Sequence, residues 1–258
     1  MRFYDLAQPL ERGMPVSPNH PSFQLALMRR HGDMVRSDGG SAANEIIVMG
    51  GHVGTHVDAL CHVSQEGLIH GGLEASEIQS QSGFSQAGIE TMAPVMSRGV
   101  LLDVAAVKGV DVLPADYEVT AEDLEEAEGA AAVRVEPGDA VLIRTGWSRH
   151  WSESEVFRGQ SGGAPGPGVE AAQWLVDREV GIAGAETIAF ERIAPGEGHS
   201  TLPVHRILLV EAGVHIIEVM NLEALGRDHI TEFLFLMAPL RLVGATGSPV
   251  RPLAIVDA

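Results

Sequence analysis

The sequence predicts an α/β protein with a single domain, residues 1–258, built around a mixed β-sheet. Three observations carry this prediction. The length of 258 residues suits one domain with a sizeable core. Hydrophobic residues make up 45% of the chain and charged residues 20%, an ordinary globular composition. Apolar runs typical of strands also alternate with segments of helical pattern, which indicates an interleaved α/β order.

Five apolar runs bounded by Gly, Pro or Asp predict strands, and we expect several of them to be buried. They are "NEIIVMGG" (44–51), "GVLLDVAAV" (99–107), "GDAVLIRTGW" (138–147), "GVHIIEV" (213–219) and "EFLFLMAPLRLV" (232–243).

Three segments between these runs predict helices. The segment 120–132 begins with Thr120 and has Asp123 three residues later, the pattern of a capping box. The segment 167–181 has apolar residues near helical spacing and ends at a glycine. In the segment 202–213, a proline can open the helix and a glycine can close it.

One segment, 152–168, is rich in Gly, Pro and Ser and predicts a long irregular connection. It is either a mobile surface loop or part of a substrate lid. Trp147 and Trp151 come just before it, and they either line an aromatic substrate pocket or pack against the helix that follows.

Charge and cysteine content exclude some functions. Acidic residues outnumber basic ones 35 to 17, for a net charge of −18, so we expect no nucleic acid and no anionic membrane as a partner. The N-terminus lacks the apolar stretch of a signal peptide, which favours a cytoplasmic protein. Cys61 is the only cysteine, so no intrachain disulfide forms; it is either a packed side chain or a reactive thiol or metal ligand.

The stretch "GGHVGTHVDALCH" (50–62) concentrates groups that bind protons and metals. In an extended strand, His52, Gly54, His56 and Asp58 would share one face, whereas a helix would separate them. We therefore predict a strand in which Gly54 leaves room for a ligand. Imidazole nitrogens with a carboxylate suit zinc, manganese or iron(II), so the sequence predicts a divalent metal site.

Two downstream residues are candidates for the other half of this site. His205 falls in the first turn of the helix predicted at 202–213, and Glu218 falls at the end of the strand predicted at 213–219. A glutamate among apolar residues needs a partner, because burying its charge alone costs several kcal/mol. A metal ion is the strongest available partner.

The residues quoted above resemble a known family. "HVGTHVDALCH" is similar to the motif H-x-G-T-H-x-D-x-x-x-H of the cyclase family of metal-dependent hydrolases, which includes bacterial kynurenine formamidase and isatin hydrolase. The resemblance extends over most of the chain through "DLAQPLERGMPV" (5–16), "GDAVLIRTGW", "GAETIAFE" (184–191) and "HRILLVEAGVHIIEVMNL" (205–222), in the family's order.

The resemblance implies a swivelling β/β/α-like fold, a homodimer or homotetramer, and one or two divalent ions, zinc or manganese, per subunit. The implied metal ligands are His52, His56, Asp58, His205 and Glu218. The implied general acid/base is His62. Ser17 stands where kynurenine formamidases have a substrate-contacting tryptophan. The motif's usual proline before the last histidine is absent, and the run Ala59-Leu60-Cys61 stands in its place.

The resemblance implies a hydrolase, and we expect water activated by the metal to attack the carbonyl group of a small amide, lactam or lactone. His62 would move the proton to the leaving group. Two alternatives stay open at this point. One is a cyclase of aromatic polyketides, in which the same metal polarises a carbonyl group. The other is a small-molecule binder without turnover.

Overall fold

The computed structural model of the protein describes residues 1–257, and its main element is a nine-stranded mixed sheet. The strands of this sheet are β1 (Arg2–Asp5), β4 (His56–Asp58), β9 (Val95–Asp103), β11 (Ala140–Arg144), β13 (Ile182–Ala185), β14 (His215–Glu218), β15 (Glu232–Met237), β16 (Gly247–Pro249) and β17 (Leu253–Val256). Their order is β1-β17-β15-β9-β11-β13-β14-β4-β16. The predicted α/β fold with a mixed sheet is confirmed.

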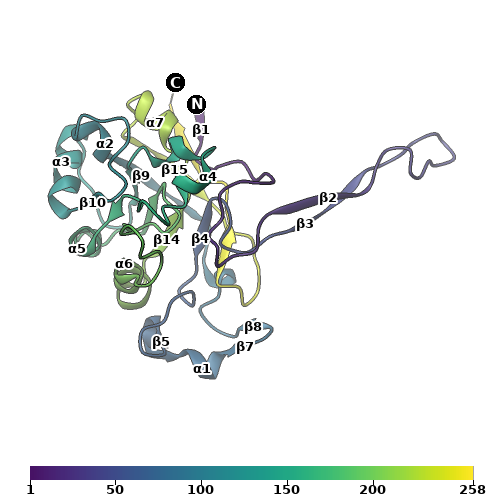
Figure 1. The fold of residues 1–258 in the computed structure, drawn as a ribbon, viewed down its shortest axis with the longest axis horizontal. Helices are drawn as coiled ribbons and strands as arrows, with labels where there is room; N and C mark the ends of the chain where they lie inside the picture. Colours follow the sequence, from purple (N-terminus) through teal and green to yellow (C-terminus); the bar gives the residue numbers. More distant parts are fainter. Residues whose placement is uncertain (258) are drawn as a thin grey trace.

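The centre of the sheet is parallel and both of its flanks are antiparallel. β9, β11, β13 and β14 run parallel to one another, while β15 and β4 pair antiparallel at the two sides of this block. At one edge β1 pairs with β17, so the two ends of the chain lie side by side (Figure 1). All five residues of β11 are buried, as expected of a strand covered on both faces.

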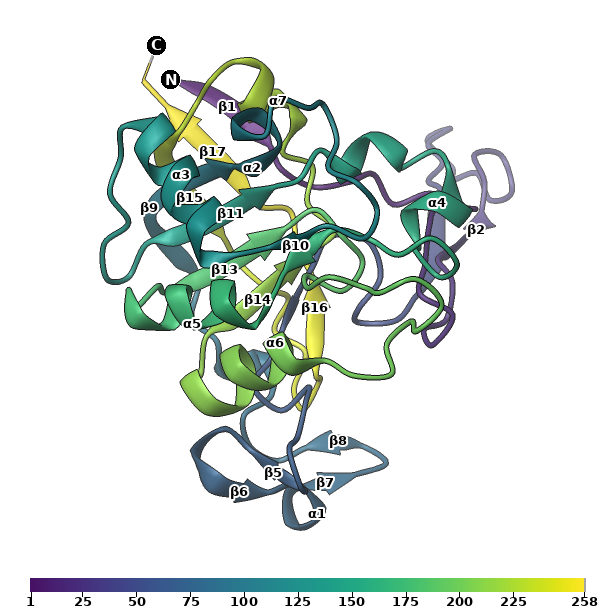
Figure 2. The same ribbon diagram turned by 60° about the vertical axis from the view of Figure 1, so that its left-hand side comes forward.

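Helices cover one face of the sheet (Figure 2). They are α2 (Val104–Val107), α3 (Ala121–Ala131), α5 (Val169–Asp177) and α6 (Pro203–His205), which continues as the π-helix η4 (Arg206–Ala212). One core cluster, including Leu124, Trp174 and Val141, joins these helices to the sheet. A second cluster, including Leu142, Ile217 and Phe235, lies on the opposite face.

The helix boundaries predicted from capping signals are confirmed. Thr120 accepts a hydrogen bond from the backbone N–H of Asp123, and the Asp123 carboxylate accepts one from the N–H of Thr120. Pro203 opens α6, and Gly213 ends η4 in the left-handed conformation at φ 72°. The π-helical hydrogen bonding between them was not predicted, because it depends on packing rather than on a local motif.

The remaining elements are short. They are β5 (Leu68–Ile69), η1 (His70–Gly72), β6 (Leu73–Glu74), α1 (Ala75–Ile78), β7 (Gln79–Ser80), β8 (Gly83–Phe84), η2 (Ile89–Thr91), β10 (Glu118–Val119), η3 (Trp147–His150), α4 (Ser154–Phe157), β12 (Gly166–Pro167) and α7 (Glu223–Arg227). Among residues 1–257, none of the helices combines the length and the apolar composition needed to cross a membrane.

Four of the five predicted strand runs belong to the large sheet, and the first one does not. Residues 44–51 contain β3 (Asn44–Val48), which pairs only with β2 (Gln24–Arg29) in a long hairpin that projects from the body (Figure 1). We call residues 24–48 the arm. Every residue of β2 and β3 is exposed, so the run at 44–51 contains a strand, as predicted, but is not one of the buried ones.

The irregular segment 152–168 packs onto the body through its own side chains. It contains α4 and β12, and Phe157 is fully buried. The indole N–H of Trp147 donates to the carbonyl oxygen of Phe157 at 3.0 Å, and the ring of Trp151 meets the Phe157 ring edge-on. Of the two alternatives for these tryptophans, packing against the following segment is the one that the structure shows.

Candidate metal centre

Strand pairing brings two carboxylates and a histidine to one point in the sheet. His56 and Asp58 are separated by one residue on β4, so their side chains leave the same face. Glu218 is the direct partner of His56 across the antiparallel pair of β14 and β4. The Nε2 atom of His56 lies 3.2 Å from Oε2 of Glu218 and 3.6 Å from Oδ1 of Asp58.

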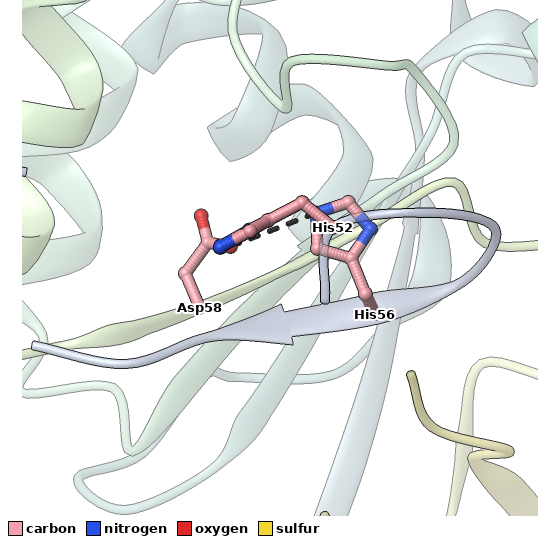
Figure 3. Close-up of side chains that lie close together, drawn as sticks. All are labelled: His52, His56 and Asp58. Atoms are coloured by element: carbon pink, nitrogen blue, oxygen red, sulfur yellow. Dashed lines mark hydrogen bonds and ion pairs between the residues drawn. The ribbon is translucent and has the colours of Figure 1, made fainter. Parts of the chain in front are cut away.

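His52 reaches the same point from a turn rather than from the strand, so the prediction of one extended strand over His52–Asp58 is wrong. Residues 51–55 form turns and bends, and Gly54 takes the left-handed conformation at φ 70°. The expectation that Gly54 leaves room for a ligand is also wrong, because the side chain of Leu10 occupies that space. The ring still converges on the site, with Nδ1 2.8 Å from Oδ1 of Asp58 (Figure 3).

His205 closes the site from the helix side. Its Nε2 atom lies 3.1 Å from Oε1 of Glu218 and 3.7 Å from Oδ2 of Asp58. Its Nδ1 atom lies 2.7 Å from Oε1 of Glu191, whose carboxylate also accepts the backbone N–H groups of Val204 and His205. Glu191 therefore fixes the orientation of the His205 ring and leaves Nε2 facing the two other carboxylates.

The five predicted metal ligands thus form two overlapping groups. One group is His52, His56 and Asp58, and the other is Asp58, His205 and Glu218. Within each group the candidate ligand atoms lie within 4.8 Å of one another. Asp58 belongs to both groups, since its Oδ1 atom faces His52 and His56 while its Oδ2 atom faces His205.

The unsatisfied atoms of this cluster test whether a metal ion fits it. Within the described part of the chain, Nε2 of His56, Oδ2 of Asp58 and Oε1 of Glu218 are buried and have no hydrogen-bond partner of good geometry. Buried polar atoms are rarely left unpaired, because desolvation without compensation costs free energy. Imidazole nitrogens and carboxylate oxygens are ligands that zinc and manganese accept. The residues present therefore fit a divalent ion.

The charges of the site also favour a bound cation. Burial opposes protonation of His205, but the neighbouring carboxylates of Glu191 and Glu218 outweigh it and raise the pKa of His205 to about 10. Burial also opposes ionisation of Asp58, but the imidazoles of His62 and His52 hold the pKa of that carboxyl well below its usual range. The site stabilises positive charge, and a metal ion would displace the proton from His205 when it binds.

His62 lies next to the ligand groups but belongs to neither of them. Its ring stacks on that of His52, with 3.9 Å between centroids, and lies 6.3 Å from the ring of His205. Burial lowers the pKa of His62 to about 4, although the nearby Asp58 opposes this. A neutral imidazole at this place is able to accept a proton, while its catalytic role stays a prediction.

Two further histidines lie at the site, and the sequence did not predict them. The ring of His20 stacks on His52 with 5.4 Å between centroids. His199 is half-buried, and burial lowers its pKa while Glu218 opposes the shift. Neither belongs to the 50–62 motif. In the sequence, nothing but their residue type marks these two histidines, so their position beside the candidate ligands could not be predicted.

A small cavity adjoins these histidines. It is lined by Ser17, Pro18, Asn19, Arg158, Gln160, Ile188, Gly198 and His199. Ser17 is only 5% exposed, and its hydroxyl has no hydrogen-bond partner among the described residues. The backbone N–H of His20 donates a hydrogen bond to the carbonyl oxygen of Ser17 and closes a turn. This turn connects Ser17, in the cavity, to His20, whose ring stacks on that of His52.

Cys61 lies in the core beside the site. Its side chain is 2% exposed and packs in the same cluster as Leu142, and burial raises the pKa of its thiol to about 11. The thiolate is the reactive form of cysteine, and a raised pKa depletes it at neutral pH. Of the two alternatives for this residue, the packed side chain is the one that the structure shows.

Comparison with known proteins identifies the family. A family model described as "Putative cyclase" matches residues 4–192, and the chain therefore belongs to the cyclase family. It is 26% identical over 224 residues to isatin hydrolase of Roseibium aggregatum, covering 85% of this chain and 77% of that protein. It is 26% identical over 254 residues to kynurenine formamidase of Sphingopyxis alaskensis, covering 97% and 96%.

A solved structure supports the same assignment. The crystal structure of a novel cyclase superposes with a TM-score of 0.88 at 29% identity, covering 99% of this chain and 88% of that one. The family resemblance inferred from the sequence is confirmed. Both named relatives are hydrolases, which supports a hydrolase activity for this chain.

Proposed function

We propose that this protein is a metal-dependent hydrolase that cleaves a small amide, lactam or lactone. The observation that carries the proposal is a set of three buried atoms that lack a hydrogen-bond partner: Nε2 of His56, Oδ2 of Asp58 and Oε1 of Glu218. They converge where the family motif places histidine and aspartate. A divalent ion, zinc or manganese, provides the partner that each of them lacks, and the shared Asp58 accommodates one or two ions.

The protein residues divide into those that hold the ion and those that serve the substrate. His52, His56, Asp58, His205 and Glu218 would bind the metal. When bound, such an ion supplies an activated water molecule and stabilises negative charge on a carbonyl oxygen. Glu191 holds the ring of His205, so that its Nε2 atom stays aimed at the site.

His62 is the proposed proton carrier. Its place beside His52 and outside both ligand groups leaves its ring nitrogens available to exchange protons. Burial keeps the ring neutral, so one ring nitrogen is free to accept a proton, which His62 would pass to the leaving nitrogen or oxygen. Such a role is typically worth about 10² to 10⁴ in rate.

The substrate is a small molecule with a carbonyl group, and we place part of it in the cavity beside Ser17. The unpartnered hydroxyl of Ser17 and the guanidinium of Arg158 line this cavity and offer hydrogen bonds to polar groups of the substrate. We further propose a cytoplasmic protein that binds neither nucleic acid nor membranes, in line with its charge of −18.

Substrate screening on the metal-loaded protein tests the proposal. The panel contains formamides, cyclic imides, lactams and lactones, and product masses identify any bond cleaved. We expect turnover of at least one compound, which disappears when the metal is removed and returns when it is restored. Turnover that survives complete metal removal, or a panel left intact by protein of verified metal content, would count against a hydrolase of this class.

A further inference from the structure

Each histidine among the candidate ligands has one ring nitrogen that faces the site and one that is bonded away from it. In His56, Nε2 faces the site, and Nδ1 lies 2.8 Å from the carbonyl oxygen of Gly54. In His205, Nε2 faces the site, and Nδ1 lies 2.7 Å from Oε1 of Glu191. Histidines that bind metals commonly donate their second ring N–H to a fixed acceptor, which sets the orientation of the ring.

His52 has the same arrangement with its two nitrogens exchanged. Its Nδ1 atom faces the site and lies 2.8 Å from Oδ1 of Asp58 (Figure 3). Its Nε2 atom lies 2.9 Å from the side-chain hydroxyl oxygen of Thr246, which is 194 positions away in the sequence. Thr246 is therefore in the position of the outer acceptor for the third histidine.

The residue after Thr246 leaves room for the ring. A Cβ atom on Gly247 would lie 2.5 Å from Cε1 and 2.9 Å from Nε2 of His52, distances that real side chains do not tolerate. The ring of His52 therefore lies directly on the backbone of Gly247. We call Thr246 and Gly247 the seat of His52, because the first bonds the ring and the second gives it space.

The seat is fixed to the strand that carries two other candidate ligands. Gly247 begins β16, which pairs antiparallel with β4 and places Gly247 opposite Asp58. The carbonyl oxygen of Thr246 accepts a hydrogen bond from the backbone N–H of Ala59 at 2.9 Å. His52 itself lies on a turn. The seat therefore gives the ring a support that the turn around His52 lacks.

Stacking alone does not orient this ring. His20 and His62 stack on His52, with 5.4 and 3.9 Å between ring centroids. A half-turn of the imidazole about its Cβ–Cγ bond would replace Nδ1 with Cδ2 and Nε2 with Cε1 while the stack stays nearly the same. Only the partners of the nitrogens, Asp58 and Thr246, distinguish the two orientations. When Asp58 binds a cation, Thr246 is the one that remains as a hydrogen-bond acceptor.

We infer that Thr246 is a positioning residue of the metal centre, whose hydroxyl accepts the N–H of Nε2 and keeps Nδ1 of His52 turned to the site. The inference rests on the proposed function, because it treats His52 as a metal ligand. It adds a residue outside the 50–62 motif and outside residues 4–192, which the family model matches. The hydroxyl is uncharged, so its effect should be smaller than that of Glu191.

Metal titration of two Thr246 variants tests the inference. Thr246→Val removes the hydroxyl and keeps the branched shape, and we expect the affinity for zinc and for manganese to fall by about tenfold. Thr246→Ser restores the hydroxyl and should recover most of this loss.

Ser248→Ala is the matched control on the same strand. The Ser248 hydroxyl is buried, accepts the backbone N–H of Leu240 and donates to the carbonyl oxygen of Pro249, so it bonds no candidate ligand. Its loss should lower the melting temperature and leave the metal affinity unchanged. An equal loss of affinity in Ser248→Ala and Thr246→Val would mean that β16 acts as a whole and that the Thr246 hydroxyl has no special role.

Nitrogen-15 NMR of the histidine rings gives a readout that a loss of stability alone would not change. In the zinc-loaded wild type, Nε2 of His52 should carry the proton, and in Thr246→Val the His52 signals should broaden or divide between two ring orientations. Wild-type affinity in Thr246→Val, or a His52 Nε2 without a proton in the zinc-loaded protein, would overturn the inference and leave the metal site in place. A wild type that binds no zinc or manganese would overturn the proposed site and this inference with it.

Discussion

The candidate metal centre and the arm depart from the usual distribution of side chains in opposite ways. At the centre, polar atoms of His56, Asp58 and Glu218 are buried without partners. On the arm, apolar side chains such as Met28 and Ile47 are exposed without cover. Each departure costs free energy in an isolated chain. A bound cation would relieve the first of them.

The two regions also differ in how they are supported. The centre is built on β4 and β14 inside the large sheet, where the pairing of His56 with Glu218 sets the positions of the ligands. The arm is supported only by pairing between its own two strands and by the cluster at its base. We therefore expect substitutions at the centre to act on metal binding and activity, and substitutions at exposed positions of the arm to leave both unchanged.

The largest expected effect is that of Asp58→Asn. Asp58 belongs to both ligand groups, so the change removes a charge that both positions use. Loss of even an outer partner weakens metal binding by about 10- to 100-fold, and we expect more than about 100-fold here, with activity near background. Elemental analysis and metal titration measure this.

A matched variant separates this effect from loss of a buried charge in general. Asp123 is a buried carboxylate that caps α3 and pairs with Lys108, away from the metal centre. Asp123→Asn should cost about 1–3 kcal/mol of stability and leave the metal content unchanged. If both variants kept their metal equally well, Asp58 would not be a ligand.

Next in size is His62→Ala. Because His62 is assigned to proton transfer and not to metal binding, kcat should fall by about 10² to 10⁴ while metal content stays near that of the wild type. Metal stoichiometry, melting temperature and kcat are measured on one preparation. His70→Ala is the control, since His70 is half-buried and bonds the carbonyl of Val210. It should alter stability and leave the rate per folded molecule unchanged.

Loss of metal together with activity in His62→Ala would make His62 a ligand instead. Normal turnover with normal metal content would remove it from the mechanism.

A smaller effect is expected from Glu191→Gln. The amide cannot match the carboxylate as a partner of Nδ1 of His205, so metal affinity should weaken by about 10- to 100-fold. Glu186→Gln is a control of the same type, because Glu186 is fully buried but bonds Ser148 and the backbone of Thr145 and Gly146. Titration with zinc or manganese compares the two. Equal affinities in both variants would mean that Glu191 has no role in holding the ligand.

The sequence predicted those parts of the centre that depend on local spacing or on the cost of burial. His52, His56 and Asp58 follow from one motif, and Glu218 follows from a carboxylate in an apolar run. Glu191 is also a carboxylate that follows apolar residues. The cost of burying a carboxylate without a partner could therefore have marked Glu191 as a candidate for the site. The turn at Gly54 was not predictable, because it depends on contact with Leu10, which lies 44 positions earlier.

The position of the arm was not predictable for a related reason. "NEIIVMGG" has the same apolar pattern as strands of the core, and a pattern of side chains does not say what covers them. The strands with which a run pairs decide whether its side chains are covered. β3 pairs only with β2, whereas β14 lies between β13 and β4 inside the sheet.

The most direct test of the central claim is to locate the metal by anomalous diffraction from crystals of the reconstituted protein. The account predicts one or two peaks at the zinc or manganese edge, within coordination distance of the three unpartnered atoms, Nε2 of His56, Oδ2 of Asp58 and Oε1 of Glu218. A reconstituted protein with the fold described above and no peak at these atoms, or with its metal bound elsewhere, would contradict it.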